Sequence, residues 1–287
     1  MRTAVLFPGQ GSQTTDMRSI VEAHRPDLVD LVIEATGDDP FARIDDGTRF
    51  VQPALFAAGL AAWAGLADRV GPVHAFAGHS LGELTALTAA GVLSEPDAIE
   101  LVVLRGRLME EAAKAAGDGG MLAIVGDDAR PRGARLAGQY GLVVANDNSP
   151  RQVVLSGPLP AIFDAEADAV SRGMRAVRLE VSGAFHSSAV ARAVAPFAAA
   201  LADVTLGRPT APVFSGVTAA PIEDARWCLA EGLVRPVRWH DTMRALAVAG
   251  VERFVEAGPG KVLRKLARAT VPEAETAGLD SLVAAHA

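Results

Sequence analysis

The stretch FAGHSLGEL, residues 76–84, places a serine between two glycines. Residues 78–82, GHSLG, match the pattern G-x-S-x-G, whose glycines allow a sharp turn from a strand into a helix and lift the serine hydroxyl clear of the backbone. Such a hydroxyl can attack a carbonyl carbon and form a serine ester. The alternative is that Ser80 only caps a helix, a role that serine often fills. The strand-like run VHAFA before it and the helix-like run ELTALTAA after it favour the nucleophile.

A serine hydroxyl becomes a nucleophile only with a base within hydrogen-bond reach. Of the six histidines, His186 in VSGAFHSSAV is the predicted base, and the alternative is a buried histidine with a structural hydrogen bond. About a hundred residues follow His186, and no acidic residue stands out as a third member, which departs from the serine, acid, histidine order of α/β-hydrolases. The other histidines lie in less suitable places: His24 in a charged stretch, His74 at a strand start, His79 inside the turn itself, His240 among polar helix-start residues and His286 in the tail.

Arg105 is the charged residue whose position calls for an anion. The run EPDAIELVVLRGRLMEEAAKA, residues 95–115, predicts a helix in which every residue three or four positions from Arg105 is apolar. A guanidinium that faces the core unpaired costs several kcal/mol, so it needs either a carboxylate from elsewhere in the fold or an anionic ligand. Arg107 has Glu110 and Glu111 within helical reach and is predicted on a solvated, salt-bridged face.

The composition restricts the class of protein. The 287 residues suffice for one large domain or a domain with an insertion, and the net charge of −7 lacks the positive field of a dedicated nucleic-acid binder. The single cysteine, Cys228, excludes an internal disulfide or a cysteine-ligated metal site within one chain. The apolar run before Pro8 is too short for a signal peptide, and no uncharged stretch has membrane-spanning length. We therefore expect a cytoplasmic protein that binds neither nucleic acid nor membrane.

The order of apolar runs predicts an α/β fold. TAVLF and VHAFA read as buried parallel strands, and QPALFAAGLAAWAGLADRV and LGELTALTAAGVL read as helices. From Gly120 the predicted order is β-α-β-β-α-β, the split ferredoxin-like motif. The runs PVFSGV and VERFVEAGPG would then complete the larger sheet. We expect an α/β-hydrolase-like catalytic subdomain with a parallel sheet over residues 1–116 and 183–287, and an inserted ferredoxin-like subdomain over residues 117–182.

Five ordered motifs carry a family resemblance. FPGQGSQ, GHSLGE, LRGRLM, FHS and EAGPGKVL, in this order and at these intervals, resemble the malonyl-CoA:acyl carrier protein acyltransferases. That family includes stand-alone enzymes of fatty-acid synthesis and the acyltransferases of polyketide synthases. The resemblance covers nearly the whole chain, including the position of the ferredoxin-like insertion.

The resemblance implies a role for each matching residue. Ser80 would be the acylated nucleophile, and His186 the base of a Ser-His dyad whose ring is oriented by a backbone carbonyl, which accounts for the missing carboxylate. The main-chain N–H groups of Gln10 and Leu81 would form the oxyanion hole, because the glycines of GQG permit a close approach. Gln52 would line the pocket.

The resemblance also implies how the acyl group is chosen. Arg105 would grip the free carboxylate of malonyl bidentately, as its planar fork allows. GAFH, residues 183–186, resembles the HAFH of malonyl-selective polyketide acyltransferases, although Gly183 departs from that pattern. By this resemblance, Phe185 would fill the space that an α-methyl group needs. Gly232 stands where many relatives have glutamine, and its carbonyl could still hold the imidazole N–H.

The expected function is transfer of malonyl from coenzyme A to the phosphopantetheine thiol of an acyl carrier protein, with no metal or redox cofactor. An editing hydrolase acting on acyl carrier protein is one alternative, but it has no need of Arg105. A silent module that only docks carrier protein is another, against which Ser80 and His186 argue. The transacylase subunit of a malonate decarboxylase would share the same chemistry.

Overall fold

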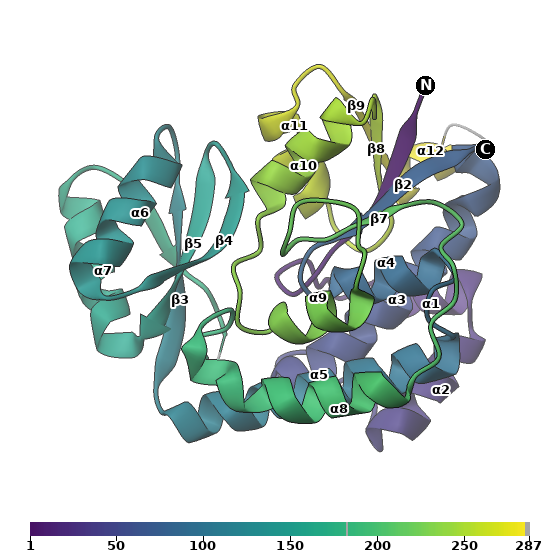
Figure 1. The fold of residues 1–287 in the computed structure, drawn as a ribbon, viewed down its shortest axis with the longest axis horizontal. Helices are drawn as coiled ribbons and strands as arrows, with labels where there is room; N and C mark the ends of the chain where they lie inside the picture. The colour runs from purple at the N-terminus through teal and green to yellow at the C-terminus, as the bar shows by residue number, and fades with distance from the viewer. Residues whose placement is uncertain (182, 285–287) are drawn as a thin grey trace.

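Five short parallel strands form the larger sheet of the protein, in the order β7-β2-β1-β8-β9. The computed structural model describes residues 1–181 and 183–284. Figure 1 shows this sheet with its surrounding helices beside a smaller lobe that carries a second sheet. The strands of the larger sheet are β1 (Thr3–Phe7), β2 (Val73–Gly78), β7 (Val213–Phe214), β8 (Arg253–Glu256) and β9 (Glu275–Gly278).

Helices cover both faces of the larger sheet because its strands are apolar on both sides. Alternate residues of a strand point to opposite faces, and in β1 Val5 and Phe7 pack into one core cluster whereas Ala4 and Leu6 pack into another. The helices around this sheet are α1 (Met17–His24), α2 (Asp27–Thr36), α3 (Thr48–Val70), α4 (Gly82–Ala89), α5 (Glu95–Ala116), the 3-10 helix η1 (Ser188–Ala193), α8 (Val194–Asp203), α9 (Ala225–Glu231), α10 (Trp239–Val248), α11 (Val262–Thr270) and α12 (Leu279–Ala284).

The second sheet is antiparallel and lies in the smaller lobe (Figure 1). Its strand order, β4-β5-β3-β6, is that of a ferredoxin-like fold. The elements of this lobe are β3 (Gly119–Val125), α6 (Ala129–Tyr140), β4 (Val143–Ser149), β5 (Gln152–Pro158), α7 (Leu159–Ser171) and β6 (Arg175–Arg178).

The expected α/β fold with a parallel sheet and an inserted ferredoxin-like unit is confirmed, whereas β9 was not anticipated. The segment ETAG that forms β9 has one exposed and one half-buried residue and no apolar run, so nothing in it indicates a strand. The division of the chain at 117 and 182 stays a prediction. Its second boundary falls on Ser182, which lies outside the described residues, as do 285–287 at the end of the predicted catalytic subdomain.

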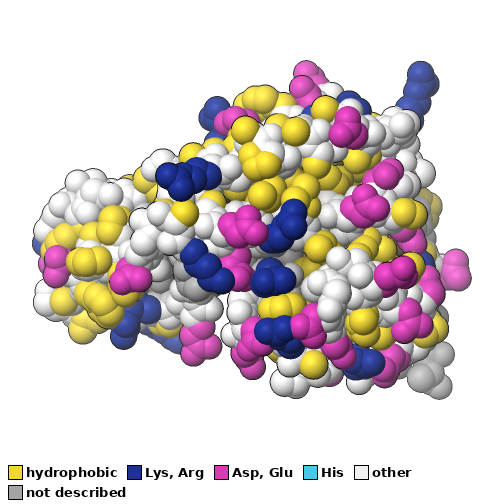
Figure 2. Space-filling model, turned by 90° about the horizontal axis from the view of Figure 1, so that it is seen from below, with side chains coloured by type: hydrophobic (Ala, Val, Ile, Leu, Met, Phe, Trp, Pro, Cys, Tyr) yellow, Lys and Arg dark blue, Asp and Glu magenta, His cyan; other side chains and the backbone are white. Residues whose placement is uncertain are grey.

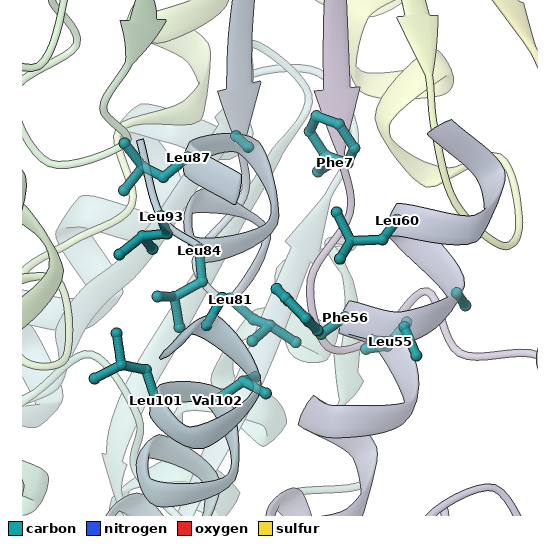
Figure 3. Packing of buried hydrophobic residues seen from close by; sticks show 14 of the residues in the cluster. Phe7, Leu55, Phe56, Leu60, Leu81, Leu84, Leu87, Leu93, Leu101 and Val102 are labelled. Carbon is teal, nitrogen blue, oxygen red and sulfur yellow. The ribbon is translucent and has the colours of Figure 1, made fainter. Parts of the chain in front are cut away.

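The helix that follows β2 is fixed by apolar contacts on two neighbouring helices. Figure 3 shows side chains of α4 and the turn before it packed between α3 and α5. The residues labelled there are Phe7, Leu55, Phe56, Leu60, Leu81, Leu84, Leu87, Leu93, Leu101 and Val102, and all are buried. Helix α3 is the one described helix long and apolar enough to cross a membrane, but 78% of its apolar window is buried inside the protein.

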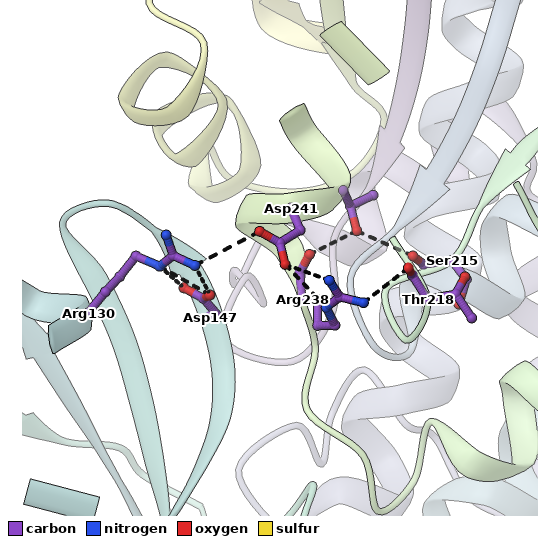
Figure 4. Close-up of polar contacts among 7 residues, drawn as sticks. Arg130, Asp147, Ser215, Thr218, Arg238 and Asp241 are labelled. Carbon is purple, nitrogen blue, oxygen red and sulfur yellow. Dashed lines mark hydrogen bonds and ion pairs between the residues drawn. The ribbon is translucent and has the colours of Figure 1, made fainter. Parts of the chain in front are cut away.

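Polar contacts tie the second sheet to the larger part of the molecule. Backbone bonds run from Asp147 N to Val237 O at 2.9 Å and from Val237 N to Ala145 O at 2.8 Å. Arg130 pairs with Asp147 at 2.6 Å, and its Nη2 lies 3.9 Å from Asp241, which in turn pairs with Arg238 (Figure 4). These contacts fix the segment before α10 against β4.

Basic and acidic side chains are interspersed on the surface, and Figure 2 shows one such face. Most ion pairs among the described residues join exposed or half-buried partners, such as Arg18 with Glu22 and Arg43 with Asp46. Exposed pairs contribute little to stability. These exposed pairs therefore add little to the stability of the fold.

Candidate active site

The turn between β2 and α4 holds Ser80 in a strained backbone conformation. Ser80 has φ 54°, which is the left-handed region. A Cβ on Gly78 would lie 1.9 Å from the carbonyl carbon of Gly82, so only glycine fits there. Ser80 does not cap α4, because the N-cap position is Leu81 and no side chain bonds the helix start. This is the geometry of a nucleophile elbow, in which strain exposes the hydroxyl.

Ser80 and His186 form a hydrogen-bonded pair although 106 positions separate them. Ser80 Oγ lies 2.8 Å from His186 Nε2, and His186 Nδ1 lies 3.1 Å from the carbonyl oxygen of Arg235. Because a carbonyl can only accept, Nδ1 carries the proton of the neutral ring and Nε2 is free to accept from the serine. The carbonyl oxygen of Arg235 orients the ring, and the carbonyl of Gly232, which the resemblance had suggested, also acts on it.

His186 is held neutral. Burial lowers the pKa of His186 to about 3, and the nearby charge of Arg105 acts in the same direction. The carbonyls of Arg235 and Gly232 oppose this shift only in part. A neutral imidazole can accept a proton, so His186 is in the form that a general base needs at any pH well above 3.

Arg105 is hydrogen-bonded directly to the nucleophile, and a chain of hydrogen bonds links it to Gln10 on the other side. Its side chain is 4% exposed, Nη1 donates to Gln52 Oε1 at 2.7 Å, and Nη2 donates to Ser80 Oγ at 3.1 Å. Gln52 Nε2 donates to Thr48 Oγ1 at 2.9 Å, and Thr48 Oγ1 donates to Gln10 Oε1 at 2.8 Å. In the described part of the chain Arg105 makes no ion pair at 4.0 Å or less. Burial lowers its pKa to about 10, which leaves it charged at neutral pH.

The face of α5 that carries Arg105 is buried, as its sequence indicates. The opposite face is exposed as predicted except at Glu110. Arg107 is exposed and lies 4.0 Å from Glu111, as predicted. Glu110 was predicted on the same solvated face but is 6% exposed. It accepts from Lys114 Nζ at 2.6 Å and from the backbone N–H of Arg49 at 3.4 Å.

The loop after β1, which carries Gln10, lies against the elbow that carries Ser80 and Leu81. A Cβ on Gly9 would lie 2.3 Å from the carbonyl oxygen of His79 and 3.6 Å from the nitrogen of Leu81, so the loop after β1 touches the elbow. Among the described residues, no acceptor is bonded to the N–H of Gln10 or of Leu81. Unpaired N–H groups next to a nucleophile are what an oxyanion hole requires.

A cleft of about 390 Å³ opens over Ser80. All seven residues predicted to form the site line this cleft, and they come from the loop after β1, helices α3 and α5, the elbow and the segment after β6. Those seven are Gln10, Gln52, Ser80, Leu81, Arg105, Phe185 and His186. Its far wall comes from the end of β6 and the residues after it, so the two sheets form the cleft together. Phe185 is 5% exposed and therefore can limit the width of the cleft.

Sequence reasoning missed several residues that act on this site. Thr48 joins Gln10 to Gln52, and His79 Nε2 lies 2.8 Å from Asn148 Oδ1 of β4. The ring of His79 also packs on Trp239 at 5.3 Å. Thr48 and Gln52 are one helical turn apart, but Thr48 meets Gln10 only because α3 packs beside the loop after β1, and His79 meets Asn148 only because the elbow lies against β4. Within residues 1–181 and 183–284, no group of three or more metal-binding side chains is found.

Comparison with known proteins gives consistent results. The family model of the acyl transferase domain matches residues 27–284. The malonyl CoA-acyl carrier protein transacylase of Salmonella typhimurium is 38% identical, with 99% of this chain and 97% of that protein covered. The polyketide biosynthesis protein ThaF of Burkholderia thailandensis is 41% identical over 94% of this chain, which spans about a quarter (24%) of that protein.

A solved structure matches the whole fold. The crystal structure of malonyl-CoA:acyl carrier protein transacylase from Xanthomonas oryzae superposes with a TM-score of 0.90 at 35% identity, covering 99% of this chain and 98% of that one. The elbow at Ser80, the pairing with His186 and these matches agree, and the chain belongs to the acyltransferase family of the malonyl-CoA:acyl carrier protein transacylases.

Proposed function

We propose that this protein transfers malonyl from malonyl-CoA to the phosphopantetheine thiol of an acyl carrier protein, through a malonyl ester of Ser80. The observation that carries this proposal is the shared contact of Ser80 Oγ with His186 Nε2 and Arg105 Nη2. One neighbour is a base and the other is a buried cation. Together they suit an acyl group that ends in a carboxylate.

The first half-reaction loads the enzyme. Ser80 Oγ attacks the thioester carbonyl carbon while its proton passes to His186 Nε2. The negative charge that develops on the carbonyl oxygen is met by the N–H groups of Gln10 and Leu81. The carbon–sulfur bond then breaks, and His186 returns its proton to the sulfur of coenzyme A. The second half-reaction runs the same steps in reverse with the carrier thiol, so the chemistry needs no oxidant or reductant.

Arg105 selects the acyl group in this proposal. A buried guanidinium without a carboxylate within 4.0 Å, among the described residues, favours a substrate that brings one. Gln52 holds Nη1 in place, which leaves the fork pre-oriented before the substrate arrives. This also speaks against an editing hydrolase, whose uncharged acyl groups would leave the cation unpaired. A transacylase subunit of a malonate decarboxylase would use the same residues, and the carrier protein served distinguishes it.

The decisive experiment is intact-protein mass measurement after incubation with malonyl-CoA. The wild-type chain should gain one malonyl group, and addition of an acyl carrier protein that bears phosphopantetheine should remove it. Ser80→Ala should gain none and keep a normal thermal melt, whereas Ser171→Ala, at the end of α7, should load fully. A Ser80→Ala protein that gains one malonyl group would refute the assignment of the nucleophile.

A further inference from the structure

Glu83 is a buried carboxyl group three residues from the nucleophile that no step of the proposed reaction uses. It lies in the first turn of α4 and is 4% exposed. Oε2 accepts from the N–H of Gly216 at 2.9 Å, and both of its oxygens lie 3.2 Å from Ser215 Oγ. Ser215 follows β7 and lies on the loop drawn in Figure 4. The group is thus held in a fixed position.

Glu83 and Arg105 face one small cavity under the nucleophile. That cavity has a volume of about 20 Å³, and Ser80, Glu83, Arg105 and Gly216 are among its lining residues. The two charged groups make no direct ion pair, yet Glu83 is the carboxylate whose negative charge acts on Arg105. A buried anion therefore already accompanies Arg105 before any substrate is present.

The charge of Glu83 changes near neutral pH. Burial raises its pKa to about 7, against the hydrogen bonds from Gly216 and Ser215 and the charge of Arg105. The titratable groups that face it are Arg105 from α5 and Cys228 from α9, and burial raises the pKa of the Cys228 thiol to about 11. The loop after β7 contributes only a hydroxyl and a backbone N–H. Of these groups, only Glu83 changes charge between pH 6 and 8.

We propose that Glu83 is a positioning residue that balances Arg105 in the empty enzyme and takes up a proton from water when the malonyl carboxylate binds Arg105. Two carboxylates beside one guanidinium in a low-dielectric site repel each other, so the arrival of the second favours protonation of the first. The transfer of malonyl to Ser80 is itself proton-neutral at pH 7, because the proton of the serine ends on the coenzyme A thiol. The extra proton therefore belongs to Glu83. This inference rests on the proposed function.

Proton uptake makes malonyl binding depend on pH. Below pH 7 Glu83 is largely neutral, so Arg105 meets the substrate carboxylate unopposed. Above pH 7 Glu83 is ionised and must first be protonated, so KM for malonyl-CoA should rise by up to about tenfold for each further pH unit. His186, with a pKa near 3, does not contribute to this change.

The test measures protons and malonyl groups together. Wild-type enzyme is mixed with malonyl-CoA at pH 7 in weak buffer with a pH indicator, and the malonyl-enzyme is counted by mass. We expect a fraction of a proton taken up for each malonyl group, because a carboxyl group with a pKa near 7 is partly ionised at that pH. Glu83→Gln keeps an acceptor for the Gly216 N–H but has no charge. It should still be malonylated, with no proton uptake and with a KM that is flat between pH 6 and 8.

Glu256→Gln is the matched control. Glu256 is also a buried glutamate, 1% exposed, that accepts two backbone N–H groups, but those belong to Leu263 and Arg264 of α11. Its variant should keep the wild-type uptake and KM profile. Full malonylation of the wild type without uptake and with a flat KM would overturn the role of Glu83 alone, and so would an unchanged profile in Glu83→Gln. Absence of any malonyl on Ser80 would instead overturn the proposed function and this inference with it.

Discussion

Arg105 Nη2 donates to Ser80 Oγ over 3.1 Å, so the residue expected to hold the acyl carboxylate touches the nucleophile itself. The serine oxygen accepts from Arg105 while its proton points to His186, 2.8 Å away. A substrate carboxylate that draws the guanidinium to itself therefore also frees a lone pair of the serine. In the proposed reaction, Arg105 would therefore both choose the acyl group and help to activate the nucleophile.

Arg105→Ala should change which acyl group is loaded. Loss of one side of a buried charge pair costs about 2–5 kcal/mol, so malonyl transfer should fall by that amount, while acetyl transfer falls less because an uncharged group no longer meets an unpaired cation. The melting temperature should change little, because Glu83 can become neutral when Arg105 is absent. The ratio of malonyl to acetyl loading is measured beside a thermal melt.

Arg107→Ala provides the control for this variant. Arg107 is two positions further along the same helix with its side chain 57% exposed, so its removal should leave both the loading ratio and the melt unchanged. An unchanged ratio in Arg105→Ala, together with a large drop in melting temperature, would mean that Arg105 is structural.

His186→Ala should slow acylation by a factor of order 10² to 10⁴, the usual contribution of a positioned base. The pH profile offers a second check. Because the pKa of His186 is lowered to about 3, the base stays deprotonated as pH falls from 8 to 5, and the acylation rate at saturating malonyl-CoA should not fall with a midpoint near 6.5. Rapid-quench single-turnover measurements give this rate. A midpoint near 6.5 would show that the base is a solvent-exposed histidine instead.

Thr48→Val should weaken catalysis without removing any group that touches the substrate. The hydroxyl accepts from Gln52 and donates to Gln10. Its loss removes the oxygen acceptor of the buried Gln52 amide, at a cost of about 1–3 kcal/mol. We expect a lower kcat/KM for malonyl-CoA, because Gln52 without its bond to Thr48 is less fixed in position and orients Arg105 less well. Thr88→Val is the matched change, since the Thr88 hydroxyl bonds only a carbonyl of its own helix. Equal losses in the two variants would rule out a role for Thr48 in the site.

Phe185→Leu should widen the range of acyl groups. Phe185 lines the cleft beside His186, and a shorter side chain leaves room for a branch at the α-carbon. The ratio of methylmalonyl to malonyl loading should rise by about tenfold or more, which is the value of one methyl group in an apolar pocket. Phe163→Ala, on the exposed surface of α7, should not alter the ratio. A ratio that stays constant in Phe185→Leu would assign the selection to another residue.

The sequence predicts those features of the site that depend on local pattern. The glycines around Ser80 require a tight turn, and the apolar neighbours of Arg105 require burial, whatever the rest of the chain does. His186 could be chosen only by weighing it against the other histidines, and His286 among these lies outside the described residues. Ser80, Arg105 and His186 all line the cleft.

Contacts between distant elements were beyond the sequence. The carbonyl of Arg235 reaches His186 only because Val237 is bonded to β4, and no side-chain type records where a backbone carbonyl points. Thr48 meets Gln10 through the packing of α3 beside the loop after β1. Glu83 reads as an ordinary polar residue of a helix start until the turn after β7 closes over it.

The chain enters and leaves the second sheet through β3 and β6, which are antiparallel neighbours in that sheet. The segments that lead into β3 and out of β6 therefore lie close together, and along the chain Ser80 precedes the second sheet whereas His186 follows it. Elements whose ends lie this close together can be inserted into a host without separating the parts of the chain on either side of them, so Ser80 and His186 stay in contact across the inserted sheet.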